Sequence, residues 1–237
     1  MYAGKPIIGI AGGIGSGKSF VASLFGQEGC LVLSADDQVR ALYNDPEIKE
    51  TLRQWWGDGV FNSLGEIDRR AVARRIFNNP AEKTRLESLL HPRVQHLRDQ
   101  AMQAAANNSQ VLAFVWDIPL LFEIGHHTSC DAIVFVDAPL AQRLERVLKT
   151  RGWNEAELLA RENLQLPLDN KRRMSNYILQ NTADVGFAER QVRDVLSQIL
   201  ATCSSNRPQA NPPASPAGAS AVSQDQHPPD DSRARHG

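Results

Sequence analysis

Short apolar runs alternate along the chain with longer segments whose apolar positions recur at helical spacing. Nearly continuous apolar runs are typical of parallel strands that are buried on both faces. The runs predict strands at Pro6–Ala11, Cys30–Ser34, Val111–Asp117, Asp131–Asp137 and Tyr177–Gln180. The helical segments begin near Lys18, Asp37, Pro46, Arg69, Ala81, Leu140, Glu155 and Phe187. Their alternation predicts an α/β fold with a five-stranded parallel sheet.

Residues 45–107 break this alternation, because they contain only helical patterns between the second and third strands. Asn44-Asp45-Pro46 and Asn79-Pro80 read as helix caps followed by proline in the first turn. The block is too long for a single crossover. We therefore expect a helical lobe over the carboxyl edge of the sheet.

From Cys203 onward the sequence consists mainly of Ser, Ala, Gln, Pro and Gly without hydrophobic periodicity. Such a segment cannot bury enough apolar surface to offset its ordering entropy. We expect a folded domain at 1–202 and a disordered tail at 203–237.

A glycine-rich loop separates the first predicted strand from the first helix. Its sequence fits the pattern G-x-x-x-x-G-K-S, and the strand before it and the helix after it fit as well. Backbone N–H groups of such a loop hold phosphate oxygens, which side chains would block. The expected nucleotide-binding residues are Gly12, Gly13, Ile14, Gly15, Ser16, Gly17, Lys18 and Ser19. A dinucleotide-binding G-x-G-x-x-G register does not fit these glycines.

The loop predicts ATP as the ligand, with Lys18 reaching the β- and γ-phosphates and the Ser19 hydroxyl on Mg²⁺. Asp117 ends the third predicted strand, where P-loop proteins keep an acid that holds Mg²⁺ through water. A GTPase is disfavoured because the N-K-x-D and D-x-x-G motifs are missing. A compact chain with one sheet favours a small-molecule kinase over a motor.

The second predicted strand runs into the pair Asp36-Asp37. In a doubly wound sheet the carboxyl end of that strand faces the loop across a crevice. A carboxylate there can orient an acceptor hydroxyl and take its proton. We assign this role to Asp36, and we expect Asp37 to cap the following helix.

A basic segment extends from Arg143 to Arg173, with more cations than acids. Phosphoryl transfer requires cations around the γ-phosphate, so the segment predicts a basic lid over ATP. We expect Arg146, Arg151 and Lys171 to face the phosphates. Arg143 and Lys149 are expected on a solvated helix face.

Composition narrows the remaining possibilities. The formal net charge of -1 gives no basic field for nucleic acid, and no apolar stretch is long enough to span a membrane. The three cysteines lie far apart, which indicates reduced thiols in a cytoplasmic protein. His126-His127 has no acidic or cysteine partners nearby and predicts an exposed turn. We expect a monomer or a small homo-oligomer.

With these residues placed, the chain resembles the dephospho-CoA kinase family over residues 6 to about 200. The resemblance rests on segments in a fixed order: GGIGSGKS at 12–19, Ser34-Ala35-Asp36, Gly65-Glu66-Ile67-Asp68-Arg69 ahead of Ile76-Phe77, Leu89-Leu90-His91-Pro92, Asp117-Ile118-Pro119-Leu120-Leu121-Phe122-Glu123, Gln165-Leu166-Pro167 followed by Lys171, and Tyr177-Ile178-Leu179-Gln180-Asn181.

The resemblance implies ATP-dependent phosphorylation of the ribose 3′-hydroxyl of dephospho-CoA, giving coenzyme A and ADP. It also implies the P-loop NTPase three-layer fold, with a core at 1–44 and 108–202. Residues 45–107 match the family's CoA domain, and about 143–175 its lid. Asp36 matches the proposed base of the family. His91-Pro92 is either a substrate contact or a helix terminator.

The sequence departs from the family at three places. Ser34 and Asn176 stand where acids are usual, and Arg146 and Arg151 are spaced one residue wider. Ser34 can still hydrogen-bond a ribose hydroxyl, although it adds no negative charge. The loop, its lysine and Asp36 are all present, so we expect an active enzyme. Two alternatives stay open: a P-loop kinase for a nucleoside or shikimate-like alcohol, and a non-catalytic ATP-binding regulator descended from a kinase.

Overall fold

The computed structural model describes residues 1–77, 79–182 and 184–205. Its strands are β1 (Ile7–Gly12), β2 (Leu31–Ser34), β3 (Phe114–Asp117), β4 (Ala132–Asp137) and β5 (Tyr177–Gln180). They form one parallel sheet in the order β2-β3-β1-β4-β5. The five predicted strands are confirmed. Because all of them are parallel, their carboxyl ends lie along one edge of the sheet.

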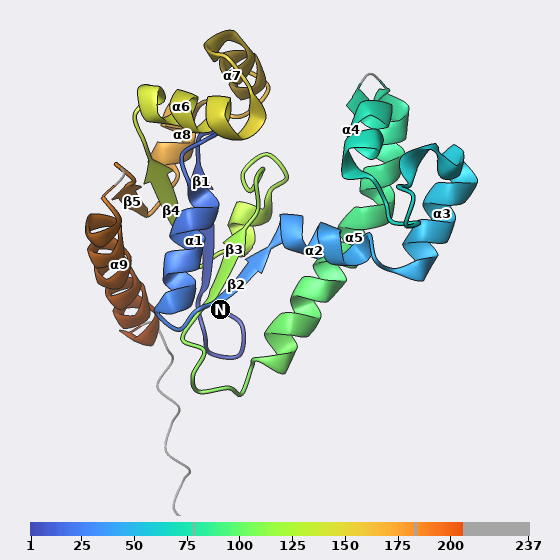
Figure 1. The fold of residues 1–237 in the computed structure, drawn as a ribbon. Helices are drawn as coiled ribbons and strands as arrows, with labels where there is room; N and C mark the ends of the chain where they lie inside the picture. Colours follow the sequence, from blue (N-terminus) through green and yellow to red (C-terminus); the bar gives the residue numbers. More distant parts are fainter. Residues whose placement is uncertain (78, 183, 206–237) are drawn as a thin grey trace, which may run out of the picture. The chain divides into compact units, whose positions relative to one another are not determined.

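The helices are α1 (Lys18–Gln27), α2 (Ala35–Leu42), α3 (Pro46–Trp56), α4 (Arg69–Phe77), α5 (Pro80–Ala104), α6 (Leu140–Arg151), α7 (Glu155–Glu162), α8 (Leu168–Arg173) and α9 (Val185–Ser205), with 3₁₀ turns at Gly57–Val60 and His126–Ser129. Helices α1 and α9 pack on one face of the sheet, through Phe25, Val192 and Ile199 (Figure 1). The other face is covered by the end of α5 and by the segment after β3, through Met102 and Phe122. The result is the expected three-layer α/β fold.

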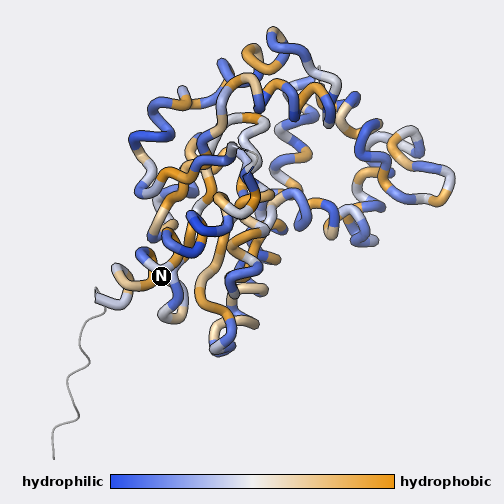
Figure 2. Tube along the Cα trace, turned by 60° about the vertical axis from the view of Figure 1, so that its left-hand side comes forward, coloured by the Kyte–Doolittle hydropathy of each residue, from blue (hydrophilic) through white to orange (hydrophobic). Residues whose placement is uncertain are grey.

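Hydrophobic residues are concentrated in the strands of the sheet and recur along the helices. Figure 2 shows orange positions along the central strands and alternating orange and blue along the helices. Every residue of β1 is buried. Among the described residues, no helix is long and apolar enough to cross a membrane.

Residues 45–107 form helices that pack in a second hydrophobic cluster, together with Leu42 of α2. Ile48, Leu52 and Val72 pack there against Leu86 and Leu90 of α5. The same helix continues to Met102 in the core under the sheet, so α5 connects the two clusters. The stretch is helical as predicted, but its cluster also includes Leu42, which we expected in the core at 1–44.

The predicted caps of this block are also present. The Asp45 side chain accepts a hydrogen bond from the Glu47 N–H at 2.8 Å, and Asn79 accepts one from the Glu82 N–H at 3.2 Å. Proline stands in the first turn of both helices.

Three sequence-based expectations need correction. Helix α2 begins at Ala35, and Ser34, not Asp37, is its N-cap, since the Ser34 hydroxyl accepts the Asp37 N–H at 3.2 Å. Pro92 lies inside α5 and does not terminate it. Packing on both clusters outweighs the backbone hydrogen bond that proline cannot donate. Helix α9 continues through Cys203 to Ser205, and the rest of the predicted tail lies outside the described residues.

Candidate active site

The glycine-rich loop connects β1 to α1 at the carboxyl edge of the sheet. Gly15 and Gly17 have φ angles of 75° and 90°, which side-chain-bearing residues rarely adopt. A Cβ at Gly17 would stand 2.2 Å from the Asn181 amide nitrogen, and one at Gly15 would stand 2.7 Å from the Arg143 carbonyl oxygen. The loop therefore requires glycine for its conformation and for close approach of later segments.

Side chains from the second half of the chain hold the loop. Arg146 of α6 donates to the carbonyl oxygens of Gly15 and Ser16 at 3.3 and 3.1 Å. Asn181, just after β5, donates from its amide to the same Ser16 oxygen at 2.8 Å. These bonds turn the carbonyl groups of the loop toward the protein. They also place Arg146, which the sequence predicted for this site, directly at the loop.

Arg143 and Glu162 form a second attachment, which the sequence did not predict. The Glu162 carboxylate pairs with Arg143 and accepts the Ile14 N–H at 3.0 Å. Arg143 also donates to the Ile14 carbonyl at 3.2 Å and is 7% exposed. The expected solvated position of Arg143 is therefore wrong, whereas Lys149 is exposed as expected. The sequence did contain a signal for the buried position of Arg143, because Arg143 stands four residues before the apolar Val147 and so on the same face of the helix. Nothing in the sequence marked Glu162.

Lys18 folds back over the loop. Its ammonium group donates to the carbonyl oxygens of Gly12 and Gly13 at 3.1 and 3.0 Å. Burial lowers the pKa of Lys18 from 10.5 to about 8, and the cations Lys171 and Arg151 act in the same direction against the attraction of Asp117. A lysine in this environment is ready to pair with an incoming anion, because the negative charge of a phosphate would favour the protonated form of Lys18.

Asp117 and Ser19 meet beside Lys18. Asp117 is buried at the end of β3, where a hydrogen bond from the Ser19 hydroxyl and the charge of Lys18 favour its ionised form. Burial is the larger influence and raises the pKa of Asp117, helped by Asp36 and Asp37. The two predicted magnesium ligands thus lie together.

Asp36 and Asp37 are both exposed in the first turn of α2. Ser34, at the end of β2, lies opposite Asp117 in the register of β2 and β3. Asp37 forms an ion pair with Arg40 at 2.6 Å. The Asp36 carboxylate has no ion pair or hydrogen-bond donor within residues 1–77, 79–182 and 184–205. Among the described residues, the Asp36 carboxylate is therefore free to bind an acceptor, whereas the Asp37 carboxylate is already paired with Arg40.

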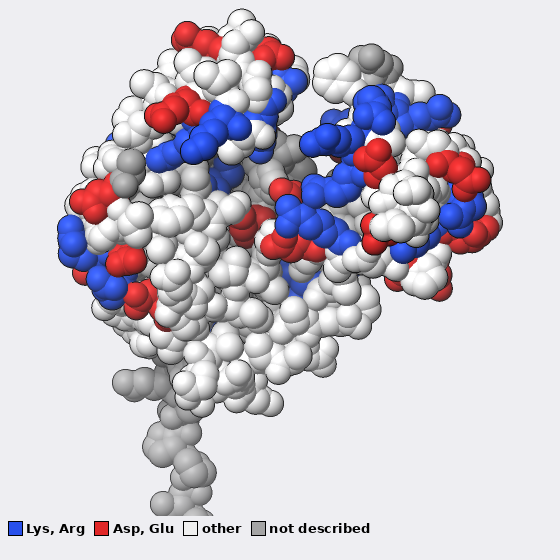
Figure 3. Space-filling view, viewed as in Figure 1, with Lys and Arg blue, Asp and Glu red and all other residues white. Residues whose placement is uncertain are grey.

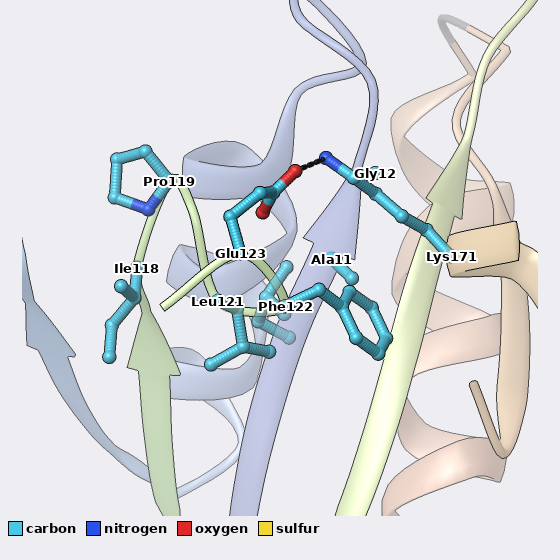
Figure 4. A pocket seen from close by; sticks show the side chains of 9 residues that line it. Ala11, Gly12, Ile118, Pro119, Leu121, Phe122, Glu123 and Lys171 are labelled. Atoms are coloured by element: carbon cyan, nitrogen blue, oxygen red, sulfur yellow. Dashed lines mark ion pairs between the residues drawn. The ribbon is translucent and has the colours of Figure 1, made fainter. Parts of the chain in front are cut away.

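Lys171 lies beside the start of the loop and is held by protein groups. It is 2% exposed, and its ammonium group lies 2.7 Å from Glu123 Oε1 and 2.9 Å from Gln165 Oε1. Figure 4 shows this ion pair beside Gly12, in a small pocket that Gly12 and Lys171 both line. Glu123 Oε1 also accepts the Leu166 N–H at 3.0 Å. Glu123 thus joins the segment after β3 to the segment before α8.

The remaining predicted residues take different places. Arg151 is exposed at the end of α6, with its guanidinium 4.7 Å from the Trp153 ring centroid. Asn176 has a structural contact, since its side-chain oxygen accepts the Ile133 N–H at 2.8 Å. The expected exposed turn at His126-His127 is wrong, because a 3₁₀ turn packs these half-buried rings against Trp116 and Phe122.

One pocket adjoins the loop, and the surface has a second hollow. A pocket of about 240 Å³ is lined by Gly17, Phe20, Arg146, Asn181 and Val185. Figure 3 shows a second hollow with Lys and Arg side chains on both flanks and Asp and Glu side chains at its base. The molecule therefore offers a partly apolar pocket at one end of the loop and a charged hollow on its face.

A parallel sheet whose first strand passes through this loop into a helix defines a P-loop NTPase fold. The model of the dephospho-CoA kinase family matches residues 6–186. The chain belongs to the dephospho-CoA kinase family.

Relatives and solved structures agree with this assignment. The chain is 40% identical to a dephospho-CoA kinase from Deinococcus radiodurans over 195 residues, 82% of this chain and 93% of the relative. A dephospho-CoA kinase from Thermus thermophilus is 37% identical over 193 residues, 81% of this chain and 91% of the relative. A Thermus thermophilus crystal structure, 35% identical, covers 82% of this chain and 97% of its own with a TM-score of 0.68. Dephospho-CoA kinase from Campylobacter jejuni, 22% identical, shares the fold with a TM-score of 0.61 over 84% of this chain and 98% of its own.

Proposed function

We propose that the protein transfers the γ-phosphoryl group of ATP to the ribose 3′-hydroxyl of dephospho-CoA, giving coenzyme A and ADP. The family assignment supports the substrates. The observation that carries the chemistry is the Asp36 carboxylate in the first turn of α2, which lies near Asp117 and has no partner among the described residues. An acid in that place can face an acceptor while the loop holds the donor.

The loop is the Walker A motif of this site and binds the phosphates of ATP through its backbone N–H groups. Lys18 leaves the carbonyl oxygens of Gly12 and Gly13 and pairs with the β- and γ-phosphates. The 240 Å³ pocket beside Gly17 receives the base, since Phe20 and Val185 give it apolar walls and Arg146 and Asn181 a polar rim.

The oxygen atoms of Ser19 and Asp117 suit Mg²⁺, which prefers oxygen ligands and keeps waters and substrate phosphates in its shell. The described ranges contain no group of three or more His, Cys, Asp or Glu residues that could hold a metal ion. Ser19 and Asp117 would hold the ion together with the nucleotide phosphates. When bound, Mg²⁺ neutralises charge on the transferring group.

Asp36 orients the 3′-hydroxyl and accepts its proton. The ribose oxygen forms the new bond to the γ-phosphorus as the bond to the β-phosphate oxygen breaks, and ADP leaves with that electron pair. Arg146 and Arg151 on α6 supply positive charge as the lid region closes. The helical lobe of residues 45–107 binds the rest of the acceptor.

The proposed cellular location and oligomeric state follow from the sequence. Cys30, Cys130 and Cys203 are free thiols, in keeping with a cytoplasmic protein. We propose that it acts as a monomer or a small homo-oligomer, without nucleic acid or membrane partners.

The test is a turnover assay with Mg-ATP and dephospho-CoA, with shikimate and adenosine as competing acceptors. We expect ADP formation with dephospho-CoA alone, and a product heavier by one phosphate whose NMR spectrum places it on the ribose 3′-oxygen. ATP binding without turnover, or turnover on another acceptor, would contradict the proposal.

A further inference from the structure

Arg98 of α5 is a buried cation. It is 3% exposed, and among the described residues it forms no ion pair. In the same part of the chain its Nε–H is buried without a hydrogen-bond partner. Burying an unpaired donor is costly, and this Nε–H can donate a hydrogen bond to a ligand.

The surroundings of Arg98 contain further groups that can donate hydrogen bonds. Its guanidinium carbon lies 4.2 Å from the Trp116 ring centroid, and the Trp116 Nε1–H is also buried without a partner among the described residues. The His126 ring stands 6.1 Å from the Trp116 ring. A guanidinium, an indole N–H and an imidazole together can bind an oxyanion, because all three can donate hydrogen bonds.

Neighbouring groups do not cancel the positive charge. Cys130 lies close to Arg98, but burial raises the pKa of its thiol to about 12, so it stays neutral at physiological pH. Burial lowers the pKa of His126, and the positive fields of Arg98 and His91 lower it further. Asp99, the next residue on the helix, attracts Arg98 electrostatically without forming an ion pair with it. The local field therefore favours an anion.

We propose that Arg98, Trp116 and His126 form a binding subsite for a phosphate-type oxyanion. Helix α5 passes here from the helical lobe to the sheet (Figure 1). Trp116 directly precedes Asp117 in β3. The oxyanion can be the diphosphate of dephospho-CoA, an assignment that rests on the proposed function, or free inorganic phosphate.

Arg85 provides a matched control on the same helix. Its guanidinium also stacks on a tryptophan, 3.8 Å from the Trp55 ring centroid, but it is exposed. Arg98→Met and Arg85→Met each remove one stacked guanidinium from α5. Only the first removes a buried cation.

The first measurement is thermal unfolding with inorganic phosphate raised at constant ionic strength, in protein saturated with Mg-ADP to fill the glycine loop. We expect phosphate to raise the melting temperature of the wild type and of Arg85→Met, but not of Arg98→Met. The second is the KM for dephospho-CoA. If the ligand is its diphosphate, Arg98→Met should raise this KM about ten- to a hundredfold and leave the KM for ATP unchanged.

Loss of the phosphate effect alone assigns the subsite to free phosphate, and a raised KM assigns it to the acceptor. An Arg98→Met protein with the wild-type phosphate response and the wild-type KM would overturn the proposal. If Arg98→Met does not fold, Trp116→Phe keeps an aromatic ring at this position and removes the indole N–H donor. An unchanged response in both measurements would then count equally against the subsite. A wild type that does not turn over dephospho-CoA refutes the proposed function, while the phosphate titration still decides the subsite.

Discussion

The glycine loop and the start of α2 meet at the same edge of the sheet, but the protein holds them very differently. Arg143, Arg146, Glu162 and Asn181 bind backbone atoms of the loop. The Asp36 carboxylate on α2 has no such partner among the described residues. The loop is therefore fixed before any ligand binds, whereas the acceptor carboxylate is left for the acceptor to engage.

The difference has a chemical reason. Phosphates need several fixed N–H donors at once, and donors that are already in place cost no reorganisation during the reaction. A general base must instead keep its lone pairs free for one proton. The contacts of the loop and the lack of contacts at Asp36 are thus two consequences of one reaction.

The largest expected effect concerns Lys18. Lys18→Ala removes the charge that stabilises the transferring phosphoryl group, so kcat/KM should fall about a thousandfold. Thermal unfolding should change little, because the lysine anchors no core. A variant with more than about a tenth of wild-type activity would show that the loop does not act through this residue.

Asp36→Asn should lower kcat about a hundred- to a thousandfold, because it keeps the shape of the side chain and removes the proton acceptor. A loose transition state deprotonates the hydroxyl late, which favours this range. Asp37→Asn is the control, and its effect should be small because Asp37 pairs with Arg40. A larger loss at Asp37 would place the base on the other carboxylate.

Arg143→Met tests the attachment of the loop. It leaves the Glu162 carboxylate without its ion-pair partner in a largely buried site, which should cost about 3 kcal/mol of unfolding free energy. Lys149→Met on the same helix should cost almost nothing, since Lys149 is exposed. Denaturant unfolding of the two variants would show equal losses if the attachment were unimportant.

A smaller effect is expected in the pH dependence of kcat/KM, which should report on Lys18 in the glycine loop. Lys18 has its pKa lowered to about 8, and only its protonated form can pair with phosphate. The value of kcat/KM for ATP should therefore be steady below this pKa and fall about tenfold for each pH unit above it. Lys18→Arg should move that fall to higher pH, since arginine stays charged. A profile that stays flat to pH 10 would contradict the role of Lys18.

Sequence patterns predicted the sheet, the helical block and the glycine loop because each depends on local periodicity or a compact motif. Asp36 could be placed because a strand end is a local feature with a known position in this fold. The pairing of Arg143 with Glu162 could not be predicted, since it joins α6 to the end of α7 and depends on how the helices turn over the loop. Lys171 lies near the loop as predicted, but only the structure shows that its ammonium group pairs with Glu123.

The dissociation constant of Mg-ATP for Asp36→Asn tests most directly whether the two regions have separate tasks. The loop and Lys18 are intact in this variant, so the constant should stay within about twofold of the wild type while turnover collapses. A tenfold weaker binding of Mg-ATP would contradict the account, because Asp36 would then act on the nucleotide and not on the acceptor.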